Sequence, residues 1–141
     1  MRKNSGFTLI ELLAVIVILA IIAVIATPLI INVIDDAKQG AFKNSAYGIV
    51  SAAEFGYAKD IVNNTAVPTT FTYTDGVEES SPIGKQLDYK GSKPQSGTVV
   101  VNSAGQVAIA IYDGKYCATK NYEDSVVSVQ ETTSTACVLP S

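Results

Sequence analysis

The chain has 141 residues and a formal net charge of −3, from 10 Lys and Arg against 13 Asp and Glu. This acidic balance disfavours nucleic-acid binding, which depends mainly on Lys and Arg side chains that contact phosphates. The sequence contains no His, the side chain used most often for acid–base chemistry near neutral pH. The composition therefore argues against nucleic-acid binding and catalysis, and no cofactor or metal is expected.

The chain begins with a basic, polar tail that is followed by a long apolar segment. Residues 12–34 contain no charged side chain. This run exceeds the ~20 apolar residues that a helix needs to cross a bilayer. Because Arg2 and Lys3 precede the run, whereas acidic residues from Asp35 onward follow it, the positive-inside rule places the N-terminus in the cytoplasm. The residues beyond Asp35 are then expected outside.

The junction between the tail and the apolar segment carries a specific motif. Gly6 ends the basic tail, Phe7 follows it, and Glu11 is the fifth residue counted from Phe7. Pro28 is the twenty-second residue on the same count. In this combination, residues 1–60 resemble the class III signal peptide and N-terminal helix of type IV pilins and of the pseudopilins of type II secretion.

The resemblance implies two roles for these residues. A membrane-bound aspartyl prepilin peptidase would cut between Gly6 and Phe7 and then methylate the new α-amine. Glu11 would pair with the Phe7 amine of a neighbouring subunit, because a lone carboxylate in an apolar helix bundle is costly unless it is paired. The alternative for Glu11 is an interfacial position at the cytoplasmic lipid headgroups.

Apolar residues recur at three- and four-residue steps beyond the membrane segment, which is typical of a helix with one buried face. We therefore predict one helix from about Thr8 to about Val62, whose second half packs on a globular head. Pro28 removes a backbone donor and clashes with the carbonyl of Val24, so a kink is expected there. The recurring residues are Phe42, Ala46, Ile49, Val50, Ala53, Tyr57 and Ile61.

The rest of the chain has the pattern of short strands separated by turns. Three of them form a predicted antiparallel meander, with a two-residue hairpin turn at Asp113 and Gly114. The predicted strands are residues 69–74, 98–101, 106–112, 115–120 and 126–129, and residues 75–82 are a predicted polar, acidic loop.

These elements predict an α+β fold, in which a long N-terminal helix packs its second half on a small antiparallel sheet, as in type IV pilins. The expected divisions are a leader peptide (1–6), a membrane or filament-core helix (7–34), its amphipathic continuation (35–62) and a head with a C-terminal cysteine loop (63–141).

Cys117 and Cys137 are the two cysteines of the chain. Their spacing is no metal motif, because C-x-x-C pairs and histidines are missing. Since the topology places them outside the cytoplasm, a disulfide is favoured over two free thiols. In the chain-entropy account, closing a loop of about 20 residues contributes roughly 3 kcal/mol.

The head offers weak candidates for chemistry. Glu78 and Glu79 are interpreted as a solvated pair and Asp113 as a turn residue, and no phosphate loop or nucleophile motif appears. Tyrosines next to lysines, as at Tyr89 and Tyr116, can suit single-stranded nucleic acid, but the acidic charge favours ordinary strand surfaces.

Three functions remain open, and the first is preferred. It is a pilin, stored in the cytoplasmic (inner) membrane and polymerised into a surface filament for adhesion or motility. Its partners would be other copies, other pilins, the prepilin peptidase and the assembly machinery. The second is a pseudopilin or competence pilin of a type II secretion or DNA-uptake system. The third is a monomeric membrane-anchored binding domain or enzyme that keeps its leader.

Overall fold

The computed structural model describes residues 6–140, so residues 1–5 of the predicted leader lie outside the described part. One long helix, α1 (Leu9–Val62), is followed by six strands and a short 3₁₀ helix, η1 (Ser134–Ala136). The predicted α+β fold is confirmed, and α1 has nearly the expected bounds. The chain divides into two compact units, Met1–Ala37 and Lys38–Ser141.

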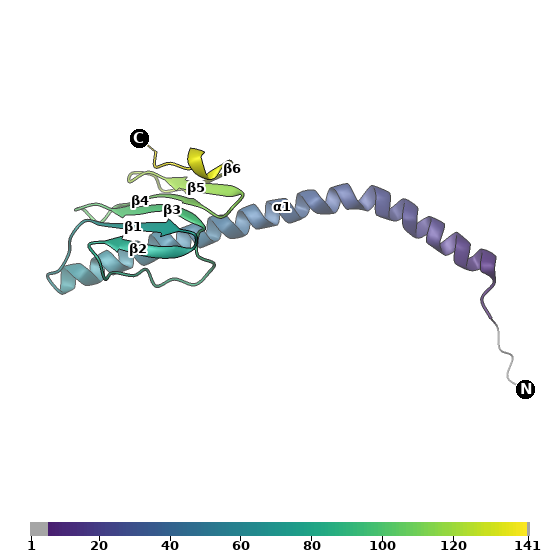
Figure 1. Ribbon diagram of the computed structural model, residues 1–141, viewed down its shortest axis with the longest axis horizontal. Helices are drawn as coiled ribbons and strands as arrows, with labels where there is room; N and C mark the ends of the chain where they lie inside the picture. The colour runs from purple at the N-terminus through teal and green to yellow at the C-terminus, as the bar shows by residue number, and fades with distance from the viewer. Residues whose placement is uncertain (1–5, 141) are drawn as a thin grey trace, which may run out of the picture. The chain divides into compact units, whose positions relative to one another are not determined.

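All six strands form one antiparallel sheet in the order β2-β1-β3-β4-β5-β6, along the C-terminal part of α1 (Figure 1). The predicted meander corresponds to β3, β4 and β5, and it extends to further strands on both sides. The strands are β1 (Thr69–Thr74), β2 (Val77–Ser81), β3 (Ser96–Val101), β4 (Val107–Tyr112), β5 (Tyr116–Lys120) and β6 (Ser128–Glu131).

The predicted acidic loop at residues 75–82 is wrong, because most of it is the edge strand β2. Asp75 and Gly76 have φ angles of 50° and 78°, and they return the chain onto β1. Positive φ at both central residues is the geometry of a type I′ hairpin turn. An edge strand has one pairing neighbour, and charged side chains on it discourage pairing with other chains. A polar sequence is therefore compatible with this strand.

Two boundaries near the C-terminus also differ from the prediction. The turn between β4 and β5 has three residues rather than two and includes Lys115. The Asp113 carboxylate holds this turn by accepting the backbone N–H groups of Lys115 at 2.9 Å and Tyr116 at 2.7 Å. Strand β6 begins at Ser128, two residues later than predicted, because Val127 is buried in the core instead of pairing.

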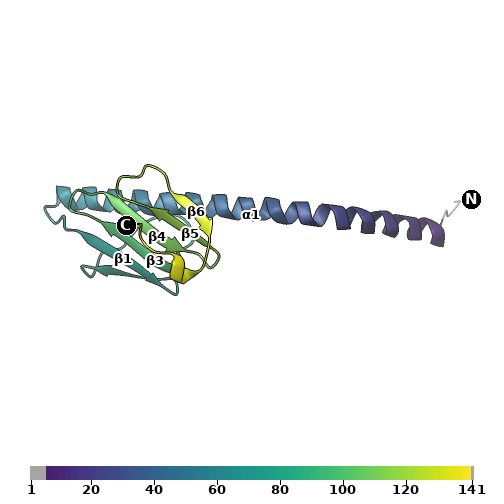
Figure 2. The ribbon, with the colours of Figure 1, turned by 90° about the horizontal axis from the view of Figure 1, so that it is seen from above.

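The core of the second unit lies between α1 and one face of the sheet. Figure 2 shows the sheet lying across the C-terminal part of α1. Phe42 and Tyr57 of the predicted stripe are partly buried. Ile61 is 55 % exposed, contrary to the prediction, because each four-residue step turns a helix by a further ~40° and carries this position off the buried face. The helix contributes Ala46, Ile49, Val50 and Ala53, and the sheet contributes mainly Val99, Val101, Val107, Ile109 and Ile111.

Candidate processing and assembly site

The predicted cleavage junction lies ahead of α1, in a segment without regular structure. The Phe7 side chain is 94 % exposed. Gly6 is exposed too, and apart from its own atoms and its two chain neighbours no heavy atom of the described residues lies within 4 Å of the place where its Cβ would stand. Exposed backbone outside helices and strands is the preferred substrate of proteases. The bond between Gly6 and Phe7 is therefore accessible.

Thr8 and Glu11 form a reciprocal cap on the first turn of α1. The Thr8 backbone N–H donates to Glu11 Oε2 at 2.9 Å, and the Glu11 backbone N–H donates to Thr8 Oγ1 at 3.3 Å. The Thr8 carbonyl accepts the Leu12 N–H at 3.3 Å. This is a capping box, which satisfies two backbone donors that the helix itself leaves free. Sequence analysis missed it, although Thr-x-x-Glu before an apolar run is its signature.

The capping box fixes where the Glu11 carboxylate lies. It folds back over the N-terminal end of α1, where the helix dipole favours a negative charge. A carboxylate has about four lone-pair positions, so the bond from Thr8 leaves it able to accept further donors. Phe7 precedes Thr8 directly, so the sequence-predicted assembly residues Phe7 and Glu11 both lie at this end of the helix.

The helix beyond Glu11 exposes apolar side chains on all sides. The large ones from Leu12 to Ile34 are 46 % to 75 % exposed. A helix of this kind is stable when lipid or other helices surround it rather than water. Within residues 6–140, α1 is the one helix long and apolar enough to cross a membrane. A membrane-anchored precursor fits this segment.

Pro28 lies inside α1, and the helix continues on both sides of it. Its neighbour Thr27 donates its hydroxyl to the Ala23 carbonyl at 2.6 Å, which satisfies the polar group without water. Such back-bonding is common for Thr in apolar helices and often accompanies bending. The kink expected at Pro28 stays a prediction.

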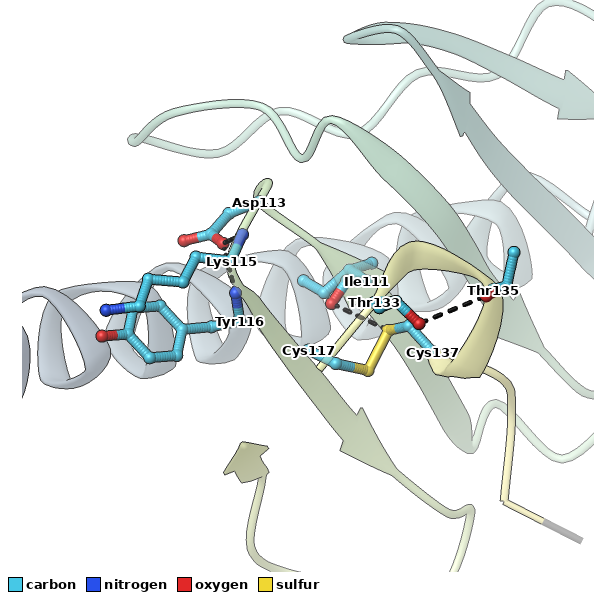
Figure 3. The surroundings of a disulfide bond; sticks show 8 residues. All are labelled: Ile111, Asp113, Lys115, Tyr116, Cys117, Thr133, Thr135 and Cys137. Carbon is cyan, nitrogen blue, oxygen red and sulfur yellow. Dashed lines mark hydrogen bonds between the residues drawn. A yellow bond between two sulfur atoms is a disulfide. The ribbon is translucent and has the colours of Figure 1, made fainter. Parts of the chain in front are cut away.

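The expected disulfide between Cys117 and Cys137 is present, with Cα atoms 5.6 Å apart (Figure 3). Cys117 lies on β5, and Cys137 follows η1 in the C-terminal segment. Ala118 belongs to the core against α1, so its neighbour Cys117 points to the opposite face of the sheet. The bond therefore ties the C-terminal segment to the sheet on the face away from the helix.

Glu78 has a structural role, which corrects its interpretation as one of a solvated pair. Its carboxylate accepts the Tyr73 hydroxyl at 2.9 Å and the Leu87 backbone N–H at 2.8 Å. Burial, together with the neighbouring Tyr89, raises the pKa of Tyr73. Burial also raises the pKa of Tyr89. This network joins β1, β2 and the following loop.

The head also contains a shallow hollow of about 230 Å³ between α1, β1 and the loop after β2. Ala53, Phe71 and Leu87 form part of its lining, and an ion pair of Lys85 with Asp60, at 2.6 Å, lies beside it. In residues 6–140 no group of three or more His, Cys, Asp or Glu side chains could hold a metal ion. The N-terminal junction is the better candidate for function.

The comparison with protein families agrees with this choice. The model of the prokaryotic N-terminal methylation motif matches residues 1–27. Neither a curated protein nor a solved structure gave a significant match. The matched range contains the Gly6–Phe7 junction and the capping box of Thr8 and Glu11. Residues 1–27 therefore carry the prokaryotic N-terminal methylation motif, which is the class III leader of type IV pilins, and this motif supports a precursor of the type IV pilin or pseudopilin type.

Proposed function

We propose that the chain is a structural subunit of a type IV pilus and has no enzymatic role. The methylation motif at residues 1–27 is the observation that carries this proposal. The exposed apolar helix and the compact unit Lys38–Ser141 support it, because a filament needs an apolar core and soluble heads. The proposed divisions are a leader (1–6), a filament-core helix (7–34), its amphipathic continuation (35–62) and a head (63–141).

In the proposed pathway, the precursor spans the cytoplasmic membrane once, with its N-terminus in the cytoplasm and its head outside. A prepilin peptidase hydrolyses the bond between Gly6 and Phe7, releases residues 1–6 and methylates the new α-amine of Phe7. The exposure of both residues ahead of α1 favours this step. Cleavage also removes Arg2 and Lys3, which hold the N-terminus in the cytoplasm.

Assembly then places the mature N-terminus of one subunit beside Glu11 of another. The carboxylate can accept the incoming amine of Phe7 while it keeps the bond from its own Thr8. In an apolar helix bundle this ion pair relieves two charges that are costly when they are separate. It therefore selects one axial register between neighbouring subunits.

The C-terminal segment, which the disulfide closes into a loop, favours a pilin over a pseudopilin or competence pilin. The disulfide ties this segment to β5 on the face of the sheet away from α1. Such a face would be available at the surface of a filament whose helices form the core. A short secretion or DNA-uptake fibre would use the same helix and the same processing, so its length and abundance distinguish it from a pilus.

The test is N-terminal mass spectrometry on the chain from sheared surface material and from membranes. We expect a mature chain that begins with N-methylated Phe7 and is the main component of sheared filaments. A chain that keeps residues 1–6 and stays in membranes of cells with the peptidase would instead be a plain anchored domain. Correct processing with few, short fibres would favour a pseudopilin. A Gly6→Val variant, with a branched side chain at the cleavage site, is the uncleaved control.

A further inference from the structure

In the head unit, the face of α1 opposite the sheet is free of charge and largely exposed. Its positions alternate between three- and four-residue steps, which is the heptad spacing of helices that pack side by side. All of them are exposed except Gly48, which is half-buried beside the Lys90 carbonyl. The stripe consists of Ala41, Asn44, Gly48, Ser51, Phe55, Ala58 and Val62.

Two large apolar side chains stand out of this stripe into solvent. Phe55 is 73 % exposed and Val62 is 82 % exposed. The sheet does not cover them, because it packs on the opposite side of α1, around Ile49 and Ala53. The small neighbours Ser51 and Ala58 would let a second helix approach closely, with Phe55 as the central anchor.

Charged residues flank the stripe in a pattern that identifies its occupant. In heptad notation Phe55 is an a position and Ala58 a d position, so Glu54 is a g position and Lys59 is the following e position. Both side chains are exposed, and neither takes part in an ion pair among residues 6–140. Charges at e and g positions pair between neighbouring helices and set their orientation.

These two charges are complementary in a parallel pair of identical helices. In register, Glu54 of each copy faces Lys59 of the other, so the pair forms twice. An antiparallel pair would bring g beside g and e beside e, with like charges together. Two chains inserted into one membrane by the same topology already run in the same direction. The flanking charges and the shared direction of membrane insertion therefore both favour the parallel arrangement.

We propose that two precursors pair in the membrane as a parallel, in-register homodimer through the stripe from Ala41 to Val62, with Glu54 of each copy against Lys59 of the other. The inference rests on the membrane anchoring in the proposed function, and it concerns a state that precedes the filament. Confinement to one membrane raises the effective concentration of the two helices, so a seam of a few turns is sufficient.

Cross-linking of the full-length chain in intact membranes tests the pairing. Ala58→Cys places a thiol at a d position, where the two copies of a parallel pair come close enough for a disulfide. Thr72→Cys is the control, because Thr72 is exposed and points to the sheet face away from α1. Mild oxidation is expected to give several-fold more dimer with Ala58→Cys than with Thr72→Cys.

Charge exchange in the Ala58→Cys background tests the orientation. Glu54→Lys or Lys59→Glu alone places like charges across both flanks and should lower the dimer yield by a factor of about five. The double variant Glu54→Lys/Lys59→Glu restores opposite charges and should restore the yield. Mass spectrometry of the cross-linked band should show two copies of this chain.

Equal cross-linking at positions 58 and 72 would overturn the inference, as would a double variant that stays as weak as the single ones. A cross-linked band that contains a different protein would overturn the inference, because the stripe would then bind another partner rather than a second copy of this chain. Processing and recovery in sheared filaments are measured in the same strains. Normal filaments without the dimer would refute only the pairing, whereas a dimer that is never cleaved would refute only the pilus function.

Discussion

Glu11 has two separable properties: its carboxylate caps α1, and it bears the charge that we propose pairs with the Phe7 amine of a neighbouring subunit. We expect Glu11→Ala to leave membrane insertion intact, since the following segment stays apolar, and to reduce incorporation into filaments. The measurement compares the amounts of the chain in membrane and sheared fractions. Normal incorporation of this variant would contradict the proposed ion pair with the Phe7 amine.

Glu11→Gln distinguishes the two functions, because Gln keeps the capping hydrogen bond to the Thr8 N–H but loses the charge. If the charge drives assembly, Glu11→Gln should fail in the same way as Glu11→Ala. If capping alone matters, Glu11→Gln should assemble as the unmodified chain does. Thr8→Ser, which keeps the other half of the capping box, should assemble normally in either case.

Tyr73 makes the stability of the head depend on pH in the alkaline range. Burial raises its pKa in the folded state, while the unfolded chain keeps a value of about 10. The resulting stabilisation is fully present below about pH 10 and is lost as the pH rises towards the higher folded pKa. Denaturant unfolding at several pH values should show this decline, and Tyr73→Phe should flatten it. An unchanged slope in Tyr73→Phe would assign the decline to other groups.

Strand β3 depends on a glycine at its second residue. Gly97 has a φ of 135°, and a Cβ there would stand 2.6 Å from Ile111 Cα and closer still to the Ala110 carbonyl oxygen on β4. These are backbone atoms in the centre of the sheet, so they cannot move aside cheaply. We expect Gly97→Ala to destabilise the head by roughly 3 kcal/mol, measured by chemical denaturation.

Gly56 is the matched control for this prediction. It lies in α1, and apart from its chain neighbours and the adjacent backbone of the helix no heavy atom of the described residues lies within 4 Å of its Cβ position. Gly56→Ala should therefore leave the head unchanged or stabilise it by up to about 1 kcal/mol through helix propensity. Equal losses in Gly97→Ala and Gly56→Ala would refute the steric explanation.

The elements differ in how far the sequence predicts them, and the reason is physical. Helix α1 and strands β1 and β3 bury apolar residues at regular steps, so their period is visible in the sequence, whereas β4 is recognisable as a short, continuous apolar run that is buried almost throughout. Strand β2 was missed, because its polar composition is typical of a loop. It is a strand because it pairs with β1. The turn at Asp75 and Gly76 was the available signal, since Asp-Gly between two runs is typical of a hairpin. The capping box at Thr8 and Glu11 was likewise visible as a local motif.

At the scale of the whole molecule, the sequence predicts the helix-on-sheet architecture but not the order of the sheet. Strand β1 pairs with both β2 and β3, and a loop of fourteen residues separates the latter two. Such a pairing depends on contacts between distant segments, which no local period records. The disulfide was predictable because the expected topology places both cysteines outside the cytoplasm, and each then has one possible partner.

The disulfide should contribute a large share of the stability of the head. It closes a loop with a sequence separation of 20, which in the chain-entropy account is worth roughly 3 kcal/mol. Serine at both Cys117 and Cys137 is expected to lower the melting temperature under oxidising conditions. The unmodified chain should shift in the same direction when a reductant is added. An unchanged melting temperature in the double variant would mean that the sheet holds the C-terminal segment without the bond.

The two units should also differ in the solvent that they require. The buried cluster of the head begins at Ala46, and the charge-free run of α1 ends at Ile34, before the acidic residues from Asp35 onward. A chain shortened to Lys38–Ser141 therefore keeps its core, its sheet and its disulfide. We expect it to stay in solution without detergent and to unfold in one cooperative transition, whereas the full chain should require lipid or detergent.

Sedimentation and thermal unfolding of the shortened chain, with the full chain in parallel, measure this difference. Aggregation or non-cooperative melting of the shortened chain would mean that the head needs the first 37 residues to fold. A full chain that stays soluble alone in water would contradict the membrane anchor instead, because its exposed leucines, isoleucines and valines would then have to be covered by copies of themselves.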